Sequence, residues 1–186
     1  MRPGERVSER GPYVIGDLPG FTPGIARLVS MMTYVRESTE EAVRGMTAGE
    51  LDYVHDARSN SVGGLLAHVA AVEEWYQGAT FFGRELGSAD MGEWGAALDL
   101  GERARREIRG RELDDYLARL RGVRATTLHE LGKRDDEWLG ETAPFWQGQP
   151  ANNHFKWFHV FEDELNHRGQ IRWLRARATA EAPPRR

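Results

Sequence analysis

The chain has 186 residues and no cysteine. Disulfide bonds, thiolate metal ligands and a cysteine nucleophile are therefore excluded, and any sulfur chemistry would need a thiol supplied from outside. Positive charge is also in short supply, because 25 Lys and Arg stand against 29 Asp and Glu, giving a net charge of −4 and a pI of about 5.9. Surfaces that bind nucleic acid are rich in Lys and Arg, so nucleic acid is not an expected partner.

Long apolar runs are missing as well. No stretch of the sequence approaches the roughly 20 apolar residues that a membrane-spanning helix needs. The N-terminal sequence also lacks the apolar segment of a signal peptide. We therefore expect a cytoplasmic protein without a membrane partner.

Helical periodicity dominates what is present. Apolar residues recur at spacings of three and four in four long segments, at about 23–45, 61–82, 112–131 and 153–178. A shorter helix is predicted around 93–107, and no convincing strand alternation occurs. The predicted fold class is all-α, a four-helix bundle. The connections between its helices are longer than tight turns, so the topology need not be a simple up-and-down one.

The distribution of Pro and Gly along the chain predicts one domain with two irregular ends. Residues 1–21 contain many Pro and Gly and should form an irregular arm, whereas 179–186 should be a solvated tail. The bundle is expected over 22–178. Thr22 followed by Pro23 is a typical helix start, with Thr22 as the capping residue.

Three side chains in two of the predicted helices suggest a metal site. Asp163 and His167 are four residues apart and share a helix face, so both can reach one cation. His68 from a facing helix would complete a set of two histidines and one carboxylate. That set suits Zn²⁺, Ni²⁺ or Fe²⁺ and leaves coordination positions open for water or a small-molecule substrate.

Plainer interpretations of the same residues stay open. A histidine on an apolar face is often a core residue with one hydrogen bond, and an Asp–His pair at this spacing can be a surface hydrogen bond. Glu162, Asp163 and Glu164 are consecutive, so most of these carboxylates must face water. Glu164 and His167 match the Glu-x-x-His pattern of di-iron bundles, but no second copy exists in the sequence.

Other polar residues of the last helix are candidates for the surroundings of the site. His159 lies one turn before Asp163 and is a candidate neighbour of the cation or substrate, although packing is its commoner use. Glu164 and Arg168 are further candidates for contacts around the ligands. Gly169, inside a helix, suggests a close approach by another helix. The remaining histidines receive no role: His55, His129 and His154.

The loop "EWLGETAPFWQGQPANN" before the last helix is rich in aromatic residues. Phe145 and Trp146 could roof the site. The favoured interpretation is a packed connection without a functional role.

Two patches of sequence resemble the DinB/YfiT-like superfamily of metalloenzymes. The segment "NSVGGLLAH", Asn60 to His68, is similar to that superfamily's second-helix signature, and "HRGQI", His167 to Ile171, is identical to the end of its last-helix signature. The resemblance spans roughly 22–178 and implies a four-helix bundle. It also implies that His68, Asp163 and His167 hold a divalent metal.

Asp163 departs from the usual pattern, which has histidine there. The related mycothiol-dependent maleylpyruvate isomerases have Glu at this position, so a carboxylate is not foreign to it. Aspartate is one methylene shorter, and its reach to the metal is the question that the sequence leaves open.

The resemblance implies a metal-dependent transferase or isomerase that uses a low-molecular-weight thiol such as mycothiol or bacillithiol as cosubstrate. The alternative is a non-enzymatic, stress-linked binding or interaction protein whose metal site is structural or vestigial. Homodimers are common among members of the superfamily that the sequence resembles, so a homodimer is a further expectation.

Overall fold

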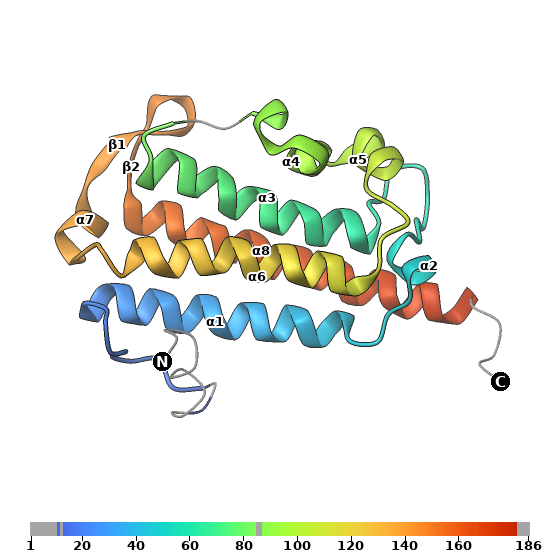
Figure 1. The fold of residues 1–186 in the computed structure, drawn as a ribbon, viewed down its shortest axis with the longest axis horizontal. Helices are drawn as coiled ribbons and strands as arrows, with labels where there is room; N and C mark the ends of the chain where they lie inside the picture. Colours follow the sequence, from blue (N-terminus) through green and yellow to red (C-terminus); the bar gives the residue numbers. More distant parts are fainter. Residues whose placement is uncertain (1–10, 12, 85–86, 182–186) are drawn as a thin grey trace.

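A computed structural model describes residues 11, 13–84 and 87–181, so most of the predicted arm and tail lies outside the described residues. In the described part the chain forms eight α-helices, two 3₁₀-helices and two short strands (Figure 1). The elements are, in order, α1 Pro23–Val43, α2 Ala48–Leu51, α3 Val62–Phe81, the 3₁₀-helix Ser88–Trp94, α4 Gly95–Asp99, α5 Gly101–Glu107, α6 Leu113–Leu131, α7 Asp136–Gly140, β1 Thr142–Pro144, the 3₁₀-helix Trp146–Gly148, β2 Pro150–Asn152 and α8 Asn153–Glu181.

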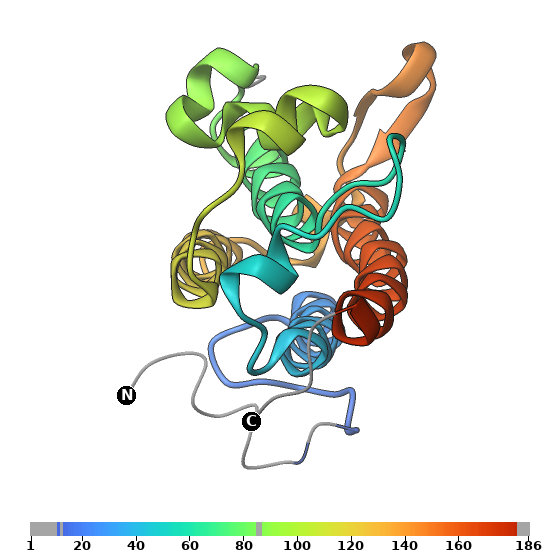
Figure 2. The same ribbon diagram turned by 90° about the vertical axis from the view of Figure 1, so that its right-hand side faces the viewer.

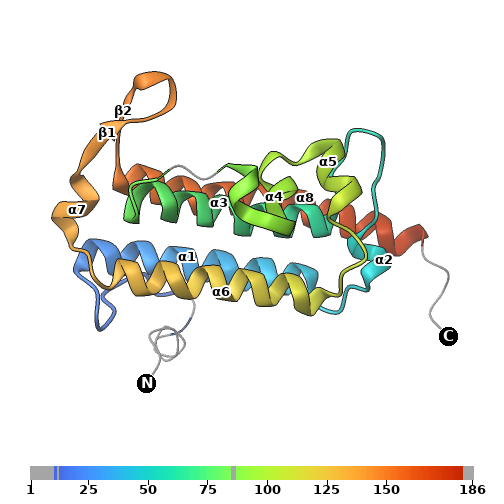
Figure 3. The ribbon, with the colours of Figure 1, turned by 45° about the horizontal axis from the view of Figure 1, so that its top comes forward.

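The four long helices α1, α3, α6 and α8 form the predicted all-α four-helix bundle. Viewed along the bundle axis, α8 lies between α1 and α3, and α6 lies beside α3 (Figure 2). Helices α1 and α8 run in one direction and α3 and α6 in the other, so the topology is not a simple up-and-down one (Figures 1 and 3). The long crossover between the parallel helices α3 and α6 carries α4 and α5, and α4 packs on α3. No helix in the described ranges is both long enough and apolar enough to cross a membrane.

The structure differs from the sequence predictions in three details. Thr22 is the N-cap of α1 and Pro23 its first residue, as predicted, but the Thr22 side chain makes no capping bond; the Asp136 carboxylate of α7 accepts hydrogen bonds from Gly24 N (2.9 Å) and Ile25 N (3.3 Å) instead. The helix expected around 93–107 is broken at Leu100, whose φ of 56° ends α4.

The third difference is a small hairpin. Thr142 pairs with Asn152, Ala143 with Ala151 and Pro144 with Pro150 in an antiparallel ribbon before α8. Strands of three residues are too short to show an alternating pattern, and for this reason they could not be predicted from the sequence.

A network of buried charges joins all four long helices in the core. Arg36 of α1 donates to Glu73 of α3 at 2.9 Å and to Glu164 of α8 at 2.9 Å. Arg124 of α6 donates to Glu73 at 2.7 Å. Thr127 of α6 donates a further hydrogen bond to Glu73 at 2.6 Å. Both carboxylates are fully buried, so each one depends on these partners.

Removing one cation should destabilise the fold strongly. We expect Arg36→Met to lower the free energy of unfolding by about 3–5 kcal/mol, because it leaves buried carboxylates short of a partner. Urea unfolding followed by circular dichroism measures the change. Arg44→Met, which removes an exposed ion pair with Glu41, is the control and should change stability by less than about 0.5 kcal/mol. Equal effects of both variants would contradict the role of the network.

Glu73 should also make stability depend on pH. Burial alone would raise the pKa of Glu73, but Arg124 and Arg36 outweigh it and lower the pKa from 4.5 to about 2. The stabilisation is therefore complete above about pH 4.5 and is lost as the pH falls toward 2, with a slope of up to ~1.4 kcal/mol per pH unit. Unfolding free energies measured across this window should show the slope in the native chain. Glu73→Gln, which cannot titrate, should flatten it, and an unchanged slope would contradict the assignment.

Candidate metal centre

The motif "NSVGGLLAH" builds the helix that presents His68. Ser61 caps α3, accepting from Gly64 N at 3.0 Å. Asn60 accepts from Gly101 N at 3.1 Å and thereby ties the start of α5 to the start of α3. A Cβ on Gly63 would lie 2.5 Å from the Tyr116 hydroxyl, so glycine permits the close approach of α6. Much of the motif therefore serves the helix that carries His68.

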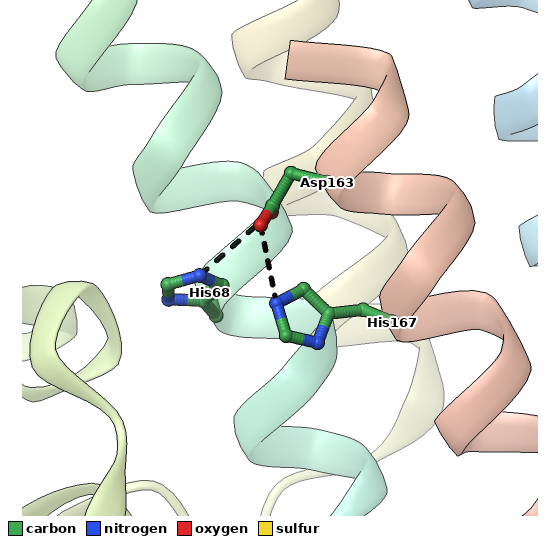
Figure 4. Close-up of side chains that lie close together, drawn as sticks. All are labelled: His68, Asp163 and His167. Atoms are coloured by element: carbon green, nitrogen blue, oxygen red, sulfur yellow. Dashed lines mark ion pairs between the residues drawn. The ribbon is translucent and has the colours of Figure 1, made fainter. Parts of the chain in front are cut away.

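His68, Asp163 and His167 converge between α3 and α8 (Figure 4). His68 Nε2 lies 3.7 Å from Asp163 Oδ2, and His167 Nε2 lies 3.4 Å from Asp163 Oδ1. The two imidazole rings are nearly perpendicular, at 84°, with centroids 4.8 Å apart. Each of the three residues offers one atom that could bind a metal, and these three atoms all lie within 4.8 Å of one another.

The crossover fixes the tautomer of His68. The carbonyl of Ala97 in α4 lies 2.8 Å from His68 Nδ1, and a carbonyl can only accept, so Nδ1 carries the proton. The lone pair of His68 is therefore on Nε2, the atom that faces Asp163. This arrangement, in which one ring nitrogen donates to a carbonyl and the other is free, is typical of histidines that bind metals.

The charges in the cluster favour an ionised carboxylate. Burial would raise the pKa of Asp163, but His167 and His68 outweigh it and lower that pKa. Burial lowers the pKa of His68 and keeps this ring neutral. Burial would also lower the pKa of His167, but the adjacent Asp163 raises it.

These side chains fit a divalent cation. Asp163 Oδ2 is buried and has no hydrogen-bond partner among the described residues, so an electron-rich oxygen is left without a donor. Two ligands at about 2.1 Å from one tetrahedral ion lie about 3.4 Å apart, close to the distances between Asp163 and the two rings. Asp163 thus lies near enough to both histidines to share an ion with them.

A cavity of about 310 Å³ opens beside the cluster, and both His68 and Asp163 line it. His159 lines the same cavity, with its Nδ1 2.9 Å from a Glu162 carboxylate oxygen. Trp146 of the hairpin lines it too and meets the His159 ring edge-on, with centroids 4.7 Å apart. Of the two interpretations of the aromatic loop, the structure therefore favours the roof, because Trp146 reaches the cavity while Phe145 packs on the core.

The other candidates around the site lie farther from it or face elsewhere. Glu164 turns into the core network with Arg36. Arg168 donates to the Ser38 hydroxyl on α1. Gly169 has open space around it and lines a polar cleft, so the close helix approach expected there is wrong.

Sequence reasoning passed over Tyr76, Trp75, Val72 and Leu98, which complete the cavity wall. The spacing of Val72 and Trp75 from His68, four and seven residues along α3, places them on the same helix face. That spacing was the available signal for them.

The fold and the cluster define a bundle of the DinB/YfiT-like superfamily with a candidate His-Asp-His metal centre. The chain belongs to the mycothiol-S-transferase family, whose model matches residues 27–180. A crystal structure of a conserved protein from Enterococcus faecalis is similar in fold, with a TM-score of 0.66 and 18% identity over 83% of this chain and 96% of that one. A search of curated proteins finds no match.

Metal content should depend on the cluster. We expect the purified chain to bind about one divalent ion, and His68→Ala/His167→Ala to lower the affinity by more than 100-fold, because one carboxylate remains. Elemental analysis and a competition titration with a chromophoric chelator measure this. His129→Ala, at an exposed position on α6, is the matched control. Equal metal content in the double variant and the native chain would refute the site.

The role of Asp163 can be tested separately. Asp163→His should retain metal, because histidine supplies a neutral nitrogen ligand from the same position on α8. Asp163→Leu should lower the affinity by about 10- to 100-fold. The same titration distinguishes these outcomes, and an unchanged affinity in Asp163→Leu would show that the carboxylate is not a ligand.

Proposed function

We propose that this protein is a divalent-metal-dependent S-transferase that joins a low-molecular-weight thiol to a small electrophile. The observation that carries the proposal is the convergence of His68, Asp163 and His167 at the wall of an open cavity. Membership in the mycothiol-S-transferase family supports the reaction class and makes mycothiol the first thiol to test. The lack of cysteine is consistent with a thiol that comes from outside.

In this proposal His68, Asp163 and His167 hold Zn²⁺, Ni²⁺ or Fe²⁺. The bound ion would lower the pKa of a coordinated thiol, so that the thiolate predominates near neutral pH. His68 keeps its lone pair directed at the site through its bond to Ala97. Three protein ligands leave at least one position for the thiol.

The surrounding residues define where the electrophile would enter. His159 and Trp146 stand at the cavity beside Asp163, so a molecule in the cavity lies next to the thiol position. Trp146 is 54% exposed and covers the cavity only in part, so the substrate can enter from solvent.

Thiol transfer should be measured directly. The metal-loaded chain is incubated with monobromobimane and, in turn, mycothiol, bacillithiol or glutathione, and the conjugate is quantified by fluorescence. We expect turnover above the uncatalysed rate with mycothiol, and a loss of more than about 100-fold in His68→Ala/His167→Ala. His129→Ala should retain full activity.

No metal-dependent turnover with any of these thiols would contradict the proposal. It would favour a binding protein with a structural metal site. Cytoplasmic residence and a homodimer stay predictions, and light scattering on the purified chain tests the dimer.

A further inference from the structure

The cavity beside the metal centre has walls of a distinct chemistry. Apart from His68 and Asp163, its lining residues are mostly aromatic or aliphatic: Val72, Trp75, Tyr76, Leu98, Trp146 and His159. Among the described residues of the lining, none is Lys or Arg. The volume of about 310 Å³ is at the small end of the range of about 300–1,000 Å³ for ligand pockets. The cavity therefore suits one small, apolar group.

Several of these rings are held in place by their neighbours. Trp75 and Tyr76 meet edge-on at 5.0 Å, and Tyr76 is only 3% exposed. Trp146 stacks on Phe145 at 4.8 Å with an interplanar angle of 27°. Because these rings are already ordered, a planar aromatic ligand could pack against them at little cost in side-chain entropy.

The described residues of the lining offer an anion no free cationic side chain. Asp163 is itself a carboxylate, and the side chain of His159 is already paired with Glu162. A carboxylate on the part of a ligand remote from the metal would be partly desolvated and would find no Lys or Arg in the described lining. An uncharged ring has no charge to desolvate and needs no cationic partner.

Polar side chains gather elsewhere. A second cleft of about 520 Å³ lies farther along the same stripe of α8, past His167, and is lined by residues that include Arg58, Asn60, Asn166 and Gln170. A hydrophilic thiol therefore has a polar surface available outside the aromatic cavity. The aromatic cavity is then available for the electrophile.

We propose that the cavity selects an electrophile whose non-reacting part is an uncharged aromatic group of one or two rings, with Trp146 as a specificity-determining residue. The assignment to the electrophile rests on the proposed transferase function. The preference of the cavity for an uncharged ring does not, and it can be measured without turnover.

Binding of two unreactive probes tests the preference. Titration calorimetry on the full-length, metal-loaded chain compares 2-naphthol with 2-naphthalenesulfonate, which share a ring system and differ in charge. A bound cation would favour the sulfonate, so a preference for naphthol must come from the cavity walls. We expect naphthol to bind at least about 10-fold more tightly. Equal affinities, or tighter binding of the sulfonate, would overturn the proposal.

Variants locate the binding. Trp146→Ala should weaken naphthol binding about 5- to 10-fold and Trp146→Phe should largely restore it, because a stacking surface returns. Trp146 is 54% exposed, so its removal should leave the fold intact. Trp173→Ala is the matched control, since Trp173 is 44% exposed on α8 and lines the polar cleft. Equal weakening by Trp146→Ala and Trp173→Ala would overturn the assignment to this cavity.

Turnover gives an independent comparison. With a thiol that supports the reaction, 1-chloro-2,4-dinitrobenzene is compared with 4-chloro-3,5-dinitrobenzoate. In both reactions a carbon–sulfur bond forms, the carbon–chlorine bond breaks, chloride leaves with the electron pair and the thiol proton passes to buffer. After division by the uncatalysed rates, we expect kcat/KM to favour the neutral substrate by about 10-fold or more.

Failure of the transferase proposal and failure of the cavity preference give different results. Naphthol binding that depends on Trp146, without turnover, would refute the transferase function and keep the cavity preference. Turnover that favours the benzoate would refute the cavity preference and keep the transferase.

Discussion

The bundle depends on one buried interaction, the contact of Arg36 with Glu73 and Glu164. These three residues come from α1, α3 and α8, and Arg124 adds α6 through its bonds to Glu73. Buried charges tolerate little displacement, since each lost contact leaves a desolvated charge. The network therefore fixes the rotation and the axial position of the helices that carry the candidate metal site.

The consequence for the site follows from helix geometry. Successive residues on a helix are rotated by about 100°, so when Glu164 points into the core, Asp163 must point to a neighbouring face. That face is the one toward α3, where His68 lies. Glu162 takes a third direction, accepts from Asn166 at 2.6 Å and lies against His159. Three consecutive carboxylates thus serve a solvent-side pair, a candidate metal centre and a core ion pair.

Some of these features could be predicted from the sequence, and others could not. Apolar periodicity located α1, α3, α6 and α8 to within a few residues, because each buries a continuous stripe in the core. The spacing of Asp163 and His167, together with the motif ending in His68, located the cluster. The core ion pairs were hidden, because Arg36 and Glu73 look like ordinary surface charges until four helices meet. Asp136 was hidden for a similar reason, since it caps a helix more than 100 residues earlier in the chain.

The bond from Ala97 to His68 gives the crossover a role beyond connecting two helices. The buried carbonyl of Ala97 in this crossover decides which nitrogen of the partly buried His68 ring is available. The segment of α4 and α5 is also anchored at the other side by Asn60, which accepts from the first residue of α5. Insertions, deletions or partner contacts in this crossover would therefore be transmitted to the donor strength of His68. The chemistry of the centre can thus be tuned from outside the bundle, without altering any of the three side chains that form it.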